Sequence, residues 1–181
     1  FSAGMRRMNP TYAGPWARIR RSSDNAEQDI AFLEDGDPDV AALTAFVGAD
    51  TWYFTTLYDN SSGAMNATQA TAANQPVGSL VGGKPVMNFN GSQWLVVASS
   101  QAYFKGLHNG QSTLISVAKA GNTADLNALG ALVANNALTT ASIGNALAFD
   151  DRAAQSRNNA AFAQITTGTG GSGVVTDARN N

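Results

Sequence analysis

The sequence predicts an all-β sandwich with one short helix, and three observations support this fold class. Short runs of β-branched and aromatic residues recur along the chain, and turn signals separate them at intervals of about 8–12 residues. Only one segment carries both the start and the stop signals of a helix. Hydrophobic residues make up 44% of the 181 residues, which is enough for one buried core.

The first strands are expected soon after the N-terminal segment. A turn signal at Tyr12–Pro15 leads into Trp16–Arg21, where successive residues alternate as they do in a strand. Asp29–Phe32 is expected to form the next short strand.

The one helix is expected at residues 40–47. Asp37 can cap its start, Pro38 suits a first helical position, and Gly48 ends it. Its larger apolar residues recur at helical spacing and therefore fall on one face, namely Val40, Leu43, Phe46 and Val47.

Further strands follow the helix. Thr51–Tyr58 is rich in β-branched and aromatic residues, which favour strands. The turn signal Gly82–Pro85 precedes a strand expected at Val86–Phe89, and another is expected at Trp94–Val97. Thr113–Ala118 is a continuous apolar run and is predicted to be a buried strand.

The Ala- and Leu-rich region Leu126–Phe149 fits either a helix or strands by its periodicity. We favour strands, because Asn135-Asn136 and Gly144-Asn145 interrupt the region at hairpin spacing. The same polar residues argue against a membrane-spanning helix.

The chain is expected to form one domain with short flanking segments. We assign residues 1–11 to an N-terminal arm and residues 12–165 to the sandwich. Residues 166–181 are assigned to a flexible tail, or to the start of missing return strands, because the segment is rich in glycine and threonine.

The composition disfavours several classes of function. Charged residues make up 13% of the chain, and the net charge of -2 disfavours a nucleic-acid partner despite the basic cluster at Arg18–Arg21. The absence of cysteine excludes disulfides and thiolate chemistry. The acidic run Glu34–Asp39 lacks the ligand spacing of an EF-hand and is interpreted as a solvated turn. We therefore expect no metal, no cofactor and no membrane partner.

A polar stretch over residues 55–76 is the main candidate for a binding surface. Amide and hydroxyl side chains dominate it and Asp59 is its one charged residue, so it suits contact with sugar hydroxyls. Tryptophan rings can stack on sugars, although they belong more often to the core. The carbohydrate-binding candidates are Trp52, Trp94, Asn60, Asn66 and Gln69.

No catalytic residue is predicted. Glycosidases need two carboxyl groups about 5–9.5 Å apart across the sugar. We interpret Asp24, beside Arg20 or Arg21, and Asp59, beside a partner arginine, instead as structural carboxylates that form ion pairs or cap turns. His108 is the only histidine, and its neighbours indicate a turn residue rather than part of a Ser-His-Asp site.

A series of short motifs in a fixed order resembles a known pattern. The chain is similar to concanavalin A-like, or laminin-G-like, jelly-roll domains of phage and prophage virion proteins. More distantly, it resembles the catalytic domain of family 54 α-L-arabinofuranosidases. The likeness covers roughly residues 5–120. The motifs are Arg6-Arg7-Met8, Tyr12–Pro15, Arg20–Asp24, Asp29–Phe32, Ala41-Ala42-Leu43, Thr55–Asp59, Asn66–Ala70 and Gly83–Val86.

The resemblance implies a jelly-roll fold and a non-catalytic structural or adhesive virion protein, such as a capsid decoration or tail-fibre component that binds carbohydrate. It also implies virion proteins and further copies of this chain as partners, polysaccharide as a ligand, and a virion or extracellular location. A secreted glycoside hydrolase resembling the arabinofuranosidases is the alternative, together with a bacterial lectin-like module. We predict no enzyme, because the resemblance places the catalytic carboxylates of those enzymes beyond this sequence, and their cysteines are missing here.

Overall fold

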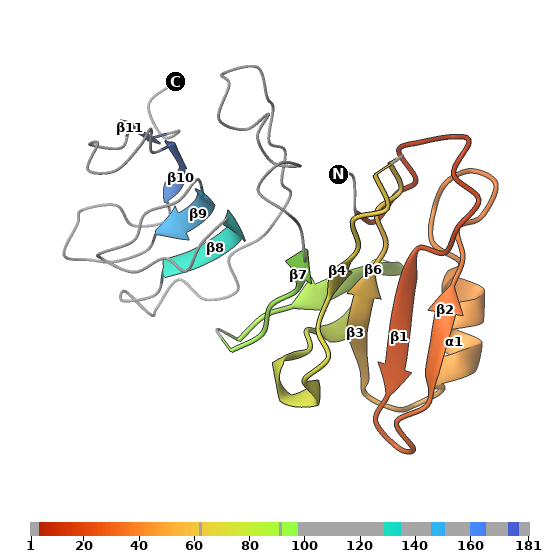
Figure 1. Cartoon of the computed structure of the whole chain (residues 1–181). Helices are drawn as coiled ribbons and strands as arrows, with labels where there is room; N and C mark the ends of the chain where they lie inside the picture. Colours follow the sequence, from red (N-terminus) through yellow and green to blue (C-terminus); the bar gives the residue numbers. More distant parts are fainter. Residues whose placement is uncertain are drawn as a thin grey trace. The chain divides into compact units, whose positions relative to one another are not determined.

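A computed structural model describes residues 4–61, 63–90, 92–97, 129–134, 146–150, 160–165 and 174–177. The chain divides into two compact units, Phe1–Ser100 and Gln101–Asn181 (Figure 1). The described residues form antiparallel sheets and one short α-helix, which confirms the predicted all-β class and matches the content of an all-β sandwich. The finer prediction of a jelly-roll connection pattern stays a prediction, as do the domain boundaries at residues 11 and 165.

The first unit contains a seven-stranded antiparallel sheet and helix α1. Along one path the strands follow the order β2-β1-β3-β4-β7, while β5 pairs with both β3 and β6. The strands are β1 Ala17–Arg21, β2 Glu27–Ile30, β3 Trp52–Leu57, β4 Ala67–Thr68, β5 Val77–Val81, β6 Lys84–Asn88 and β7 Val96–Val97, and α1 spans Val40–Val47.

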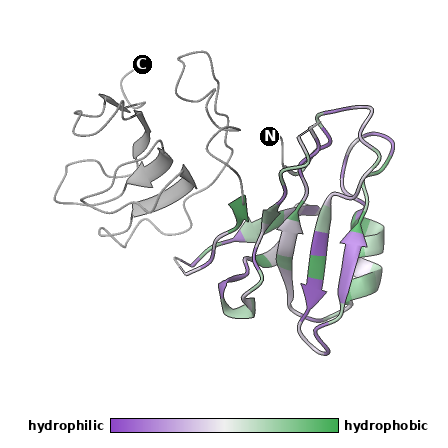
Figure 2. Cartoon of the chain, in the orientation of Figure 1, coloured by the Kyte–Doolittle hydropathy of each residue, from purple (hydrophilic) through white to green (hydrophobic). Residues whose placement is uncertain are grey.

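The two faces of this sheet differ in polarity. Helix α1 lies against the sheet and contributes Leu43 and Val47 to the core (Figure 1). Figure 2 shows largely hydrophilic colours along β1 and β2, with a hydrophobic band in β1. The buried hydrophobic core consists of Trp16, Ala17, Ile19, Ile30, Leu43, Val47, Trp52, Phe54, Leu57 and Ala67.

Strand β3 is shared by two partners on one of its edges. Thr56 pairs with Thr68 of β4, whereas Tyr53 pairs with Val77 of β5. Between these pairs the chain leaves the sheet as a loop, Gln69–Pro76, which contains a short 3-10 turn at Ala72–Asn74. The sheet therefore divides at the middle of β3, where one edge passes from β5, beside Tyr53, to β4, beside Thr56. We call this division the fork.

The predicted helix is confirmed, but its cap differs from the prediction. Asp39, rather than Asp37, accepts a hydrogen bond from the Ala42 N–H at 2.9 Å and caps the helix. Asp37 instead forms ion pairs with Arg6 and Lys84, so its carboxylate is turned to other partners. Gly48 ends the helix with a φ of 58°, as its position predicts.

Strand β5 was not predicted from the sequence. Gly78 and Ser79 interrupt the β-branched pattern that identifies a strand. The structure gives the reason for the glycine, because a Cβ at residue 78 would lie 1.9 Å from the Trp52 ring. The turn between β5 and β6 is confirmed, with Gly82 and Gly83 both at positive φ.

The N-terminal arm lies against the first unit from Gly4 onward. The Trp16 indole N–H donates to the Gly4 carbonyl at 3.1 Å, and the Arg7 N–H donates to the Gly36 carbonyl at 2.8 Å. Arg6 adds an ion pair with Asp37 at 2.9 Å. These bonds attach the arm to Trp16, just before β1, and to the turn that precedes α1.

The second unit contains a four-stranded antiparallel sheet in the order β11-β10-β9-β8. Strands replace the alternative helix within Leu126–Phe149, which confirms the prediction for that region. The predicted strand Thr113–Ala118 and His108 lie outside the described residues. The strands are β8 Leu129–Ala134, β9 Ala146–Asp150, β10 Ala160–Ile165 and β11 Val174–Asp177.

The close contact between Gly78 and Trp52 gives a test of the fork. We expect Gly78→Ala to destabilise the chain by about 1–3 kcal/mol, because the added methyl group overpacks a buried aromatic ring. Gly4→Ala is the matched control, since its Cβ would meet nothing within 4 Å. Urea unfolding followed by tryptophan fluorescence measures both, and equal midpoints for the two variants would contradict this packing.

Candidate functional site

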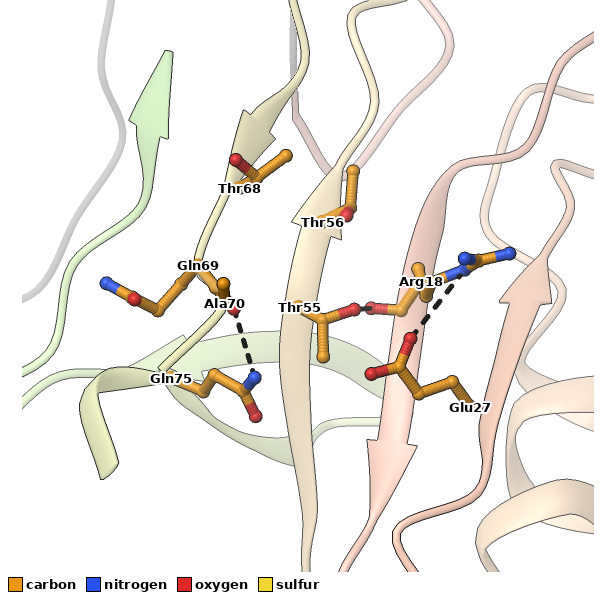
Figure 3. Close-up of a pocket in the computed structure, with 8 residues that line it drawn as sticks. All are labelled: Arg18, Glu27, Thr55, Thr56, Thr68, Gln69, Ala70 and Gln75. Atoms are coloured by element: carbon orange, nitrogen blue, oxygen red, sulfur yellow. Dashed lines mark hydrogen bonds and ion pairs between the residues drawn. The ribbon is translucent and has the colours of Figure 1, made fainter. Parts of the chain in front are cut away.

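A shallow polar pocket of 240 Å³ lies on the sheet of the first unit (Figure 3). Its floor is the middle of β3, one wall comes from β1 and β2, and the other comes from the end of β4 and the Gln69–Pro76 loop. We call it the sheet-face pocket, and it is lined by Arg18, Glu27, Thr55, Thr56, Thr68, Gln69, Ala70 and Gln75.

A β-bulge shapes the floor of the sheet-face pocket. On β1, Arg18 pairs with Thr56 and the next residue, Ile19, pairs with Phe54, so Thr55 is an extra residue in β3. The bulge allows two successive threonines to line the pocket, where a regular strand would turn them to opposite faces. The Thr55 hydroxyl donates to the Arg18 carbonyl at 3.3 Å.

The first wall is a network of charged and phenolic groups. Arg18 donates two hydrogen bonds to Asp29, from Nε at 2.8 Å and from a terminal nitrogen at 3.1 Å. Glu27 lies 4.0 Å from the same guanidinium, and the Tyr58 hydroxyl donates to Asp29 at 2.8 Å. The bidentate contact fixes the orientation of Arg18 at the edge of the pocket.

This network shifts three ionisation equilibria. Partial burial alone would raise the pKa of Asp29, but hydrogen bonds from Arg18 and Tyr58 outweigh it and hold that pKa below its usual value. Burial and the hydrogen bond to Asp29 raise the pKa of Tyr58 to about 12. The hydrogen bond to Asp29 also raises the pKa of Arg18. The network is therefore fully charged on Arg18 and Asp29 at neutral pH.

The second wall is held by buried amide groups. Gln75 is buried, and its Oε1 accepts a hydrogen bond from Arg20 Nε at 2.7 Å. The Gln75 amide donates in turn to the Gln69 carbonyl at 3.0 Å (Figure 3). The Gln69 N–H donates to the Thr55 carbonyl at 2.8 Å. These bonds tie the loop to both β1 and β3.

The predicted sugar-binding residues have different environments. Trp52 is 6% exposed and packs in the core, so its ring is not available to a ligand. Asn60 is also fully buried, and its Nδ2 has no partner among the described residues. Trp94 is 46% exposed, and Gln69 lines the sheet-face pocket. Trp52 and Asn60 are thus corrected to interior positions.

The polar loop after β3 is organised by its own side chains. The Asp59 carboxylate accepts hydrogen bonds from the backbone N–H groups of Ser61 and Met65, both at 2.9 Å. Asn66 accepts the Asp59 N–H at 3.1 Å, and Asn60 accepts the Met8 N–H at 3.3 Å. The amides that the sequence offered for sugar contact here serve the loop instead.

The ion pairs expected for the arginines are formed in part. Arg21 pairs with Asp24 at 2.7 Å, and the hydrogen bond from Arg21 lowers the pKa of that carboxyl. Within the described part of the chain, Arg20 forms no ion pair and bonds to the amides of Gln75 and Asn25. The ion pair proposed for Asp59 stays a prediction.

The chemistry of the sheet-face pocket favours binding over proton transfer. Glu27 and Asp29 both lie beside the same guanidinium, and the lowered pKa of Asp29 makes it a poor general acid near neutral pH.

Among the described residues, no group of three or more His, Cys, Asp or Glu side chains could hold a metal ion. Helix α1 is too short to cross a membrane, and the described chain has no other α-helix.

Comparison with known proteins identifies the family. The profile of the family described as "Alpha-L-arabinofuranosidase B, catalytic" matches residues 2–160. The chain belongs to this family. No curated protein matches the chain.

Two solved structures of family members are also similar. One is a Glu→Gln variant of a GH54 α-L-arabinofuranosidase soaked with 4-nitrophenyl α-L-arabinofuranoside, at 28% identity over 38% of this chain and 14% of that chain. The other is a GH54 α-L-arabinofuranosidase soaked with a cyclic sulfate inhibitor, at 24% identity over 47% and 18%. The TM-score is 0.35 for each. The match thus spans less than a fifth of either solved enzyme.

The family match corrects the prediction of function. The chain was expected to be a non-catalytic structural or adhesive virion protein, and that expectation is wrong because the matching family is a glycoside hydrolase catalytic domain. The expectation of no enzyme is wrong for the same reason. The distant resemblance to arabinofuranosidases was the correct indication, and the phage and virion assignments have no support.

Six of the eight residues that line the sheet-face pocket lie within the predicted polar stretch 55–76, but only Gln69 was named as a binding candidate, and Arg18 and Glu27 were not expected there. Thr55, Thr56 and Thr68 look like ordinary strand residues, and Gln75 looks like a loop residue. Two adjacent threonines at the middle of a strand were the available signal, because a bulge is needed for both to share one face.

The Tyr58–Asp29 hydrogen bond gives a pH test of the first wall. Because the folded pKa of Tyr58 is raised above 10.0, its neutral form stabilises the fold below pH 10, and this contribution is lost as the pH rises through about 12. We expect Asp29→Asn to lower the pKa of Tyr58, measured by ultraviolet absorption of the phenolate, with Tyr58→Phe assigning the transition. Asp24→Asn is the control, and an unchanged pKa in Asp29→Asn would contradict the network.

Proposed function

We propose that the chain forms part of a glycoside hydrolase catalytic domain that acts on α-L-arabinofuranosyl residues. The observation that carries this proposal is the family match over residues 2–160. The polar sheet face is compatible with it, since hydroxyl, amide and guanidinium groups are the usual partners of sugar hydroxyls.

The described carboxylates of the first unit mainly serve the fold. Asp24 and Asp37 form ion pairs, Asp39 caps α1, and Asp59 organises the loop after β3. Glycoside hydrolysis needs one carboxyl group as an acid and a second as a base or nucleophile. We therefore assign these four carboxylates no part in bond cleavage.

Turnover by the full chain tests the proposal. We expect release of 4-nitrophenol from 4-nitrophenyl α-L-arabinofuranoside, and much slower release from the matched β-D-xylopyranoside. Asp24→Asn should leave turnover nearly unchanged, because Asp24 pairs with Arg21 at an exposed turn. Loss of a general acid or base costs about 10²–10⁴-fold in rate, so a loss of that size in Asp24→Asn would overturn the structural assignment. Absence of turnover on the arabinofuranoside would contradict the proposed activity.

A further inference from the structure

We propose that the sheet-face pocket binds one ring of a neutral glycan through hydrogen bonds to the ring hydroxyls. The proposal deepens the proposed function, and it rests on that function for the choice of an arabinofuranosyl ring. Four features of the pocket carry it: its size, its hydrogen-bonding groups, its charge balance and its rigidity.

The size of the pocket fits a single small ring. Its 240 Å³ lies just below the roughly 300–1,000 Å³ typical of pockets for drug-sized ligands. Ala70 is the one apolar residue among those that line it, so every other lining residue can form hydrogen bonds through its side chain.

The hydrogen-bonding groups of the pocket match those of a sugar. The hydroxyls of Thr56 and Thr68 make no hydrogen bond within the described part of the chain, and each can both donate and accept. Thr56 and Thr68 are register partners on β3 and β4, so their side chains lie beside each other on one face (Figure 3). Arg18 adds donors and Glu27 adds acceptors at the opposite edge (Figure 3). Sugar hydroxyls are themselves both donors and acceptors, and this mixture satisfies both roles.

The charge balance favours a neutral ligand over an anion. The guanidinium of Arg18 is already paired with Asp29 at 2.8 Å and lies 4.0 Å from Glu27. A phosphate or carboxylate ligand would meet two carboxylates for one guanidinium, and the lowered pKa of Asp29 keeps that carboxylate ionised. An arabinofuranosyl ring carries no charge and avoids this repulsion.

The pocket is rigid before any ligand arrives, which lowers the entropy cost of binding. Its floor is a paired strand with β-branched threonines, whose side chains have few rotamers. Gln69 also donates from its side chain to the Trp94 carbonyl at 3.3 Å. This bond attaches the backbone of Trp94 to the second wall and adds to the restraints on Gln69.

The test is a titration of the isotope-labelled full chain with methyl α-L-arabinofuranoside, followed by NMR. We expect saturable amide shifts at Thr55, Thr56, Thr68 and Gln69. The double variant Thr56→Val/Thr68→Val keeps the side-chain shape and removes both free hydroxyls, and we expect it to weaken binding about tenfold. Thr68→Val alone, at an exposed position, is the milder variant if the double variant unfolds.

Matched controls separate this inference from the proposed activity. Thr51→Val removes an exposed hydroxyl outside the pocket and should bind as tightly as the natural chain. Inorganic phosphate should not shift the same amides, and equal shifts with phosphate would overturn the preference for a neutral ligand. Turnover without shifts at the pocket would overturn the pocket and leave the activity standing. Shifts without turnover would support the pocket and contradict the activity.

Discussion

The hydrogen bond between Arg20 and Gln75 is the contact on which the sheet-face pocket depends. Arg20 is 9% exposed and Gln75 is 3% exposed, so both polar groups are removed from water. A buried guanidinium is costly unless its nitrogens find partners. The side-chain oxygens of Gln75 and Asn25 accept hydrogen bonds from two of these nitrogens, at 2.7 and 2.8 Å. The guanidinium carbon of Arg20, Cζ, also lies 4.4 Å from the centroid of the Tyr53 ring. The loop that carries Gln75 is thereby fixed to β1 across the intervening strand.

The pocket follows from two irregularities in an otherwise regular antiparallel sheet. The bulge at Thr55 brings a second threonine to the floor, and the fork of β3 between β4 and β5 leaves room for the second wall. On the other face, apolar side chains such as Ile19 and Phe54 belong to the same buried core as Leu43 and Val47 of α1. One face therefore provides stability, while the irregular face provides polar groups for a ligand.

Local signals explain what could be predicted from the sequence. Helix α1 was recognised by its Pro and Gly signals, and β3 by its β-branched and aromatic residues, because these features act within a few residues. Strand β5 was missed because Gly78 is explained only by the Trp52 ring on another strand. The cap moved from Asp37 to Asp39 because Asp37 meets Lys84, which is distant in sequence.

The site was predicted less well than the fold for the same physical reason. Asn60 and Asn66 were read as surface amides, yet they bond to the backbone of the arm and of their own loop. Gln69 was the one amide candidate that proved to line the pocket, where it joins residues from four strands and a loop. The sequence shows which hydrogen bonds a polar side chain is able to form. Contacts between residues far apart in the sequence decide which partner it finds.

Hydrogen exchange in Gln75→Ala tests most directly whether the Arg20–Gln75 bond holds the fork together. The Gln69 N–H, bonded to the Thr55 carbonyl, reports on the second wall, and the Tyr58 N–H, bonded to the Trp16 carbonyl, reports on the sheet away from it. Gln28→Ala, at an exposed position, is the matched control. We expect Gln75→Ala to speed exchange at Gln69 by about tenfold or more relative to Tyr58, because about 1–3 kcal/mol of buried hydrogen bonding is lost at the loop. Equal changes at Gln69 and Tyr58, or no change at Gln69, would contradict this role of the Arg20–Gln75 bond.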